Sequence, residues 1–79
     1  MQLRLFAVAR ELVGQEWLEV ELSDEATIRD LRQALTDTAP VLARLVPHLM
    51  FAINAQYAGD TTAIPAGAEV ACIPPVSGG

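Results

Sequence analysis

Cys72 is the only cysteine of the chain, and this fact most constrains what the chain can fold into. A single cysteine cannot form an internal disulfide or complete a cysteine-based zinc site. A chain of 79 residues also buries only about 60% of the surface that it exposes when unfolded, so its stability must come from a dense apolar core. The composition meets this requirement, because 52% of the residues are hydrophobic. We therefore expect one small domain in a reducing, cytoplasmic environment, without a bound metal.

The net charge argues against nucleic acid as a partner, and the absence of a long apolar run argues against a membrane. Ten acidic and five basic residues give a net charge of -5, which repels a phosphate backbone. No apolar run approaches the roughly 18 residues of a membrane span, and the first residues lack the pattern of a signal peptide. All five basic residues are arginines, so the chain offers no lysine for Schiff-base chemistry or for an isopeptide bond.

Alternating apolar residues predict two strands in the first third of the chain, over residues 2–8 and 17–22. The residues expected to point inward are Leu3, Leu5, Ala7, Leu18, Val20 and Leu22. Phe6 then lies on the opposite face of its strand. The intervening sequence AREL, followed by Val13 and Gly14, predicts a helical turn that ends at the glycine.

The main helix is predicted to follow Asp24 or Thr27, either of which can cap its first turn. Its apolar side chains recur at helical spacing on one side: Ile28, Leu31 and Leu35. The side chains expected to face water are Arg29, Asp30, Arg32 and Gln33. A second, shorter helix is predicted to begin at Pro40 and to end near Pro47.

Two further strands complete the expected fold. The apolar run LMFAIN predicts a central strand, and EVACI predicts the last strand after a long connection. In the last strand Val70 and Cys72 face inward, whereas Ile73 shares the other face with Glu69. This order predicts an α+β fold, a β-grasp with one main helix packed across one face of a small mixed sheet. Residues 1–75 would form the domain and residues 76–79 a flexible tail.

The sequence CIPPVSGG at the end of the chain raises the question of function. Pro74 and Pro75 stop the last strand and stiffen the base of the tail. Gly78 and Gly79 have no side chains, so they can pass through a narrow channel into another protein's active site. A terminal Gly-Gly is either an inert end or a tail whose carboxylate is the reactive group.

Four stretches resemble the family of small molybdopterin synthase subunits, which are ubiquitin-like sulfur carriers: LRLFAVARELVG, TIRDLRQAL, AINAQY and GAEVACIPPVSGG. The resemblance implies that Gly79 is adenylated by a partner enzyme that uses ATP, and is then converted to a thiocarboxylate. It also implies sulfur donation to cyclic pyranopterin monophosphate, inside a heterotetramer with the large synthase subunit. A sulfur donor protein would be a further partner. The chain itself would bind no cofactor and would contribute no side-chain catalysis.

An apolar patch on the open face of the sheet is the expected docking surface for these partners. Its residues would be Phe6, Tyr57, Ile73, Pro74, Pro75 and Val76. Cys72 is expected to be an inert core residue, and His48 a surface residue. Two alternatives stay open: a carrier for thiazole or cysteine synthesis, and a ubiquitin-like interaction module with an inert tail.

Overall fold

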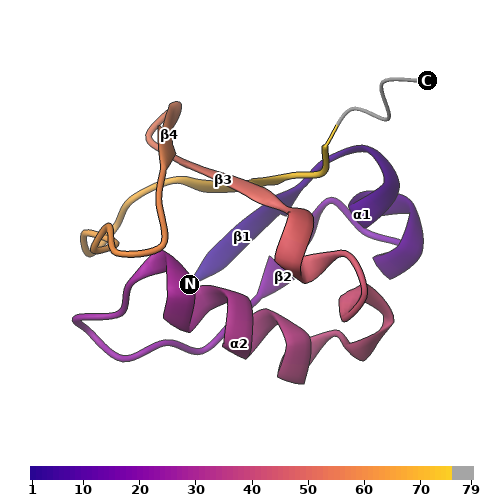
Figure 1. The fold of residues 1–79 in the computed structure, drawn as a ribbon, viewed down its shortest axis with the longest axis horizontal. Helices are drawn as coiled ribbons and strands as arrows, with labels where there is room; N and C mark the ends of the chain where they lie inside the picture. The colour runs from indigo at the N-terminus through magenta and orange to yellow at the C-terminus, as the bar shows by residue number, and fades with distance from the viewer. Residues whose placement is uncertain (76–79) are drawn as a thin grey trace.

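The computed structural model describes residues 1–75, and these form one five-stranded mixed sheet with the helices packed against it (Figure 1). The strand order is β2-β1-β5-β3-β4. The strands are β1 (Gln2–Leu5), β2 (Trp17–Glu19), β3 (Met50–Ile53), β4 (Gln56–Ala58) and β5 (Val70–Ile73). The central pair, β1 and β5, is parallel, and the other neighbours are antiparallel. No helix within residues 1–75 is long and apolar enough to cross a membrane.

Helix α2 (Ile28–Thr38) crosses one face of the sheet, as the sequence predicts. Thr27 caps it in a reciprocal box: its side chain accepts from the Asp30 amide, and the Asp30 carboxylate accepts from the Thr27 amide. Ile28, Leu31 and Leu35 are fully buried in one core with the inward side chains of the sheet. The arrangement is a ubiquitin-like β-grasp, which confirms the expected fold.

The first strand is shorter than predicted, because the chain turns at Phe6. Helix α1 (Ala7–Val13) begins where we expected the strand to continue, so Ala7 is exposed instead of inward. Its φ of 51° lies in the left-handed region, which redirects the chain from strand to helix. Gly14 ends α1 as predicted, with a φ of 85° and its amide donating to the Arg10 carbonyl at 2.8 Å.

The predicted second helix consists instead of two 3₁₀ turns, η1 (Pro40–Leu42) and η2 (Val46–His48). Pro47 lies near the start of η2 and does not end a helix there. Pro47 has no amide hydrogen to donate four residues back, and the neighbouring amides, such as those of Ala43 and His48, donate to the carbonyl three residues back. The apolar side chains still face the core, since Leu42 and Val46 are buried.

Strand β4 was missed in the sequence, where its residues belonged to a long connection. Asn54 and Ala55 form the turn between β3 and β4, with φ angles of 50° and 70°. Positive φ at both central residues is typical of the tight hairpin turn that sequences usually mark with Asn-Gly. Asn54 also fixes this hairpin to the start of β5, because its amide donates to the Glu69 carbonyl and its side chain accepts from the Glu69 amide.

Arg32 does not face water, contrary to the prediction. Its side chain is only 22% exposed and forms an ion pair with Asp60 at 2.8 Å. It also donates to the carbonyl oxygens of Val46 and Leu49, at 2.7 and 2.8 Å, and lies over the Phe51 ring. The guanidinium satisfies carbonyls of the irregular segment between α2 and β3, which a helical pattern in α2 cannot reveal.

Candidate functional site

The open face of the sheet, opposite α2, carries a straight row of side chains across all five strands. The strand register places Arg4 beside Trp17 of β2 on one side and beside Ala71 of β5 on the other. Ala71 is paired in turn with Ala52, and Ala52 with Tyr57. The row therefore has bulky side chains near both ends and two alanines in its middle.

A second row lies one step closer to the end of β5, and it is apolar. Ile73 is paired with Met50 of β3, and Phe6 directly follows the end of β1 beside it. Phe6 and Met50 are 37% and 48% exposed, and Ile73 is half-buried. The position of Met50 was missed because LMFAIN was interpreted as a strand covered by helices, whereas alternation within it would have placed Met50 on the open face.

A cavity of about 550 Å³, the open-face groove, lies across these rows. The small side chains of Ala52 and Ala71 leave room for this groove. The groove is lined by Arg4, Phe6, Ala52, Asn54, Ala55, Tyr57, Glu69, Ala71 and Ile73. The fold thus brings together the three patch residues predicted within the sheet and its edges: Phe6, Tyr57 and Ile73.

The residues after β5 begin at the end of the sheet where α1 lies (Figure 1). Pro74 is buried against the domain, and Pro75 is exposed. Of the predicted docking residues, Pro74 therefore offers little accessible surface. Val76, Gly78 and Gly79 lie outside the described residues.

Arg4 is the only basic residue among the described residues that line the groove. Its guanidinium lies 5.0 Å from the centre of the Phe6 ring and 5.6 Å from that of Trp17. One terminal nitrogen donates to the Glu16 carboxylate at 3.1 Å. The Nε–H is shielded from solvent and has no hydrogen-bond partner within residues 1–75. Neither the aromatic contacts nor the central position of Arg4 was foreseen from the sequence.

Cys72 lies on the opposite face, in the core, as expected. Its side chain is fully buried, and burial raises the pKa of the thiol from 9.0 to about 12, against a weaker lowering by Arg32. The thiol is therefore neutral at physiological pH and a poor nucleophile. His48 is exposed at the end of η2, and no cluster within the described part of the chain has the ligands for a metal ion.

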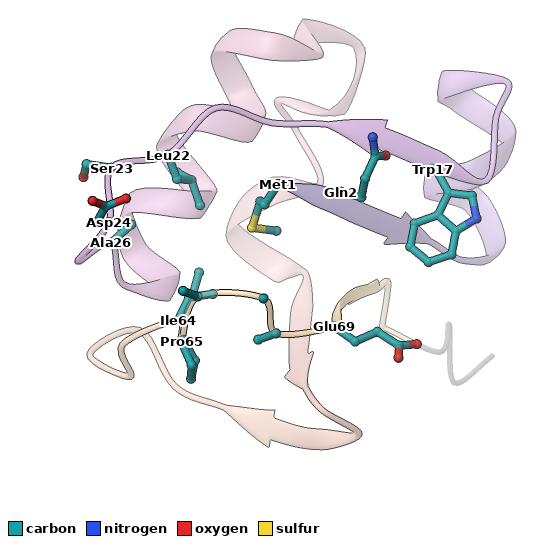
Figure 2. A pocket seen from close by; sticks show the side chains of 13 residues that line it. Met1, Gln2, Trp17, Leu22, Ser23, Asp24, Ala26, Ile64, Pro65 and Glu69 are labelled. Atoms are coloured by element: carbon teal, nitrogen blue, oxygen red, sulfur yellow. The ribbon is translucent and has the colours of Figure 1, made fainter.

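A second cavity, of about 680 Å³, lies at the other end of the sheet, where β1 and β5 begin (Figure 2). Figure 2 shows the side chains of Met1, Leu22 and Ile64 gathered in its centre, with Trp17 and Glu69 farther along the sheet. The amino group of Met1 is held beside it by the Glu19 carboxylate and the Val20 carbonyl. This cavity is remote from Pro74 and Pro75.

Known proteins match this chain over its whole length. Residues 3–79 match the sequence profile of the ThiS family. The chain is 37% identical to the molybdopterin synthase sulfur carrier subunit of Chlamydomonas reinhardtii, with 100% of both chains covered. It is 33% identical to small archaeal modifier protein 1 of Haloferax volcanii, again over 100% of both. A crystal structure of SAMP1 from Haloferax volcanii superposes with a TM-score of 0.84 at 33% identity, covering 100% of this chain and 98% of that one.

Proposed function

Because this chain belongs to the ThiS family of sulfur carriers, we propose that it is the sulfur carrier subunit of a molybdopterin synthase. The observation that carries this proposal is the position of the second, apolar row of side chains on the open face of the sheet. Phe6, Met50 and Ile73 lie at the end of the sheet from which the chain continues through Pro74 and Pro75 toward Gly79. A partner that binds the open face would therefore be adjacent to the segment that delivers the terminal carboxylate.

The proposed reaction takes place at Gly79, in the active sites of partner enzymes. A free carboxylate is a poor acyl electrophile, so a partner enzyme first transfers AMP from ATP to it and releases pyrophosphate. Hydrosulfide delivered by a donor protein then attacks the acyl carbon, so that a C–S bond forms, the C–O bond to AMP breaks with AMP as the leaving group, and a thiocarboxylate remains. The large synthase subunit binds this terminus, and two carriers supply the two sulfurs of the dithiolene built on cyclic pyranopterin monophosphate. Each carrier gives up one sulfur, and its Gly79 terminus returns to a carboxylate. No side chain of this chain is required as an acid, base or nucleophile, which agrees with the buried, neutral Cys72 thiol.

The test is a pair of variants that shift the carboxylate along the tail. One carries an added alanine after Gly79, which displaces the carboxylate by roughly 3.5 Å, and the other lacks Gly79. A misplacement of about 1 Å can already cost a hundredfold in a positioned reaction, so both should fail. Each variant is incubated with ATP, the adenylating enzyme and a sulfur donor. Mass spectrometry then measures the mass gained when one oxygen of the carboxylate is exchanged for sulfur. Both variants should melt like the parent, and full activity of the extended chain would refute a role for the Gly79 carboxylate.

A second candidate function is the covalent modification of other proteins, which the likeness to small archaeal modifier protein 1 favours. The same activated Gly79 would then be attacked by a lysine amine instead of a sulfur nucleophile. The chain has no lysine, so copies could not be linked to one another through side-chain amines. Thiol-resistant conjugates of a tagged chain with other proteins would support this function. A carrier for thiazole or cysteine synthesis would gain sulfur but yield no dithiolene with the large subunit, and an inert interaction module would gain no sulfur.

A further inference from the structure

We propose that Arg4 is the polar anchor of the open-face groove and donates to a carboxylate side chain presented by the large synthase subunit. This inference rests on the proposed function and adds the chemical identity of one partner group. The apolar residues of the groove can bind many apolar surfaces. A charged group at a defined position would restrict binding to a partner with the complementary charge.

The first argument is the position of Arg4 in the middle strands of the sheet. It lies between Trp17 and Ala71 in the register, and Phe6 follows two residues later on the same face. The rings of Phe6 and Trp17 lie within 5.0 and 5.6 Å of the guanidinium carbon and so restrict its position. A guanidinium that is already oriented loses less conformational entropy when a partner binds.

The second argument is that the hydrogen-bonding capacity of Arg4 is mostly unused. A guanidinium has five N–H donors, and within residues 1–75 the Arg4 side chain makes a single hydrogen bond, to Glu16. The Nε–H lies buried without an acceptor, an arrangement that costs stability in the free protein. Buried polar groups without partners are rare in native proteins, so this one indicates a requirement outside the stability of the isolated domain.

The pair with Glu16 leaves Arg4 available to a partner. Both side chains are about 40% exposed, at 39% for Arg4 and 41% for Glu16, and such ion pairs contribute little in water. A partner that covers the groove would exclude water and strengthen any charge-assisted hydrogen bond inside it. A carboxylate is the favoured acceptor, since it can bind two N–H groups at once and carries the charge opposite to that of Arg4, the only cation among the described groove residues.

The test uses binding of the large molybdopterin synthase subunit of the same organism, measured by titration at low and high salt. Arg4→Met removes the charge but keeps an apolar stem against Phe6 and Trp17. The matched control is Arg29→Met, which changes the net charge equally on an exposed position of α2, remote from the open face. Glu16→Gln removes the internal ion pair, and circular dichroism and melting verify the fold of each variant.

We expect Arg4→Met to weaken binding at least about tenfold and to reduce its salt dependence, whereas Arg29→Met has little effect. Glu16→Gln should bind as tightly as the parent or more tightly, because it frees the guanidinium. Equal binding by Arg4→Met and Arg29→Met, or equal losses in Arg4→Met and Glu16→Gln, would overturn the proposal. Failure of the proposed function itself would be seen separately, as a parent chain that gains no sulfur in the presence of ATP.

A measurement on the parent chain decides the matter if Arg4→Met does not fold. Because its Nε–H is shielded from water, the Arg4 side-chain signal should be observable by ¹H–¹⁵N NMR. Binding of the large subunit should shift the guanidinium signals of Arg4 strongly and leave those of Arg29 unchanged. An Arg4 spectrum that does not change in the complex would show that no partner group binds there.

Discussion

Cys72→Ala should separate the packing role of the only thiol from the sulfur chemistry proposed for Gly79. Cys72 is fully buried between the central strands and α2, so the substitution removes one sulfur atom from a packed core. The expected loss in the free energy of unfolding is about 1 kcal/mol near neutral pH, a small cavity effect. The variant should still accept sulfur at Gly79, because burial holds the thiol in its unreactive neutral form.

The pH dependence of stability gives this prediction a sharper form. The folded-state pKa of Cys72, about 12, lies above the unfolded value of 9.0, so the unfolded chain loses the thiol proton first as the pH rises. The contribution of the protonated Cys72 thiol to the free energy of unfolding is therefore fully present below pH 9.0. It is lost as the pH rises from 9.0 to about 12. The loss is about 1.4 kcal/mol per pH unit above the unfolded pKa. The parent and Cys72→Ala should therefore become equally stable at about pH 10.

The assay is urea unfolding of both proteins across this pH range, together with thiocarboxylate formation at neutral pH. Parallel stability curves above pH 9.0 would refute the argument that the folded thiol remains protonated. A folded Cys72→Ala variant that forms no thiocarboxylate would show that the chemistry was assigned to the wrong group.

Three further substitutions test individual parts of the structure. Ile73→Asp introduces a charge into the apolar row beside Met50, so it should weaken binding of the adenylating enzyme and of the large subunit by about 2 kcal/mol in titrations, with an unchanged circular dichroism spectrum. Arg32→Met removes the ion pair with Asp60 and the side-chain hydrogen bonds to the carbonyl oxygens of Val46 and Leu49, of which Val46 keeps the Leu49 amide as a donor. It should lower the free energy of unfolding by about 1–3 kcal/mol. Ala55 has a φ of 70°, which is strained for alanine, so Ala55→Gly should raise the free energy of unfolding by about 1 kcal/mol and raise the melting temperature with it. A lower melting temperature would contradict the strain at this turn.

The predicted docking residues show how far the sequence can place side chains on one face of the sheet. Alternation placed Phe6 and Ile73 on the open face, and the structure has both residues there, Phe6 directly after β1 and Ile73 on the neighbouring strand β5. The same alternation places Arg4 on this face, but alternation does not reveal which groups Arg4 contacts. Its contacts with Trp17 and Glu16 depend on the register of β1 against β2, which local alternation does not specify.

The sequence by itself determined that a helix with Ile28, Leu31 and Leu35 on its inner side follows Asp24 or Thr27, and that the chain continues from the last strand into Pro74 and Pro75. These features depend on local physical chemistry: hydrophobic period, capping by Thr27 and the missing amide of proline. Only the tertiary structure decided that β5 lies between β1 and β3, that β4 forms the edge, and that Arg32 satisfies distant carbonyls. Those outcomes depend on pairings between residues that lie far apart in the chain. Such pairings become stable only when the sheet and the helix pack together and exclude water.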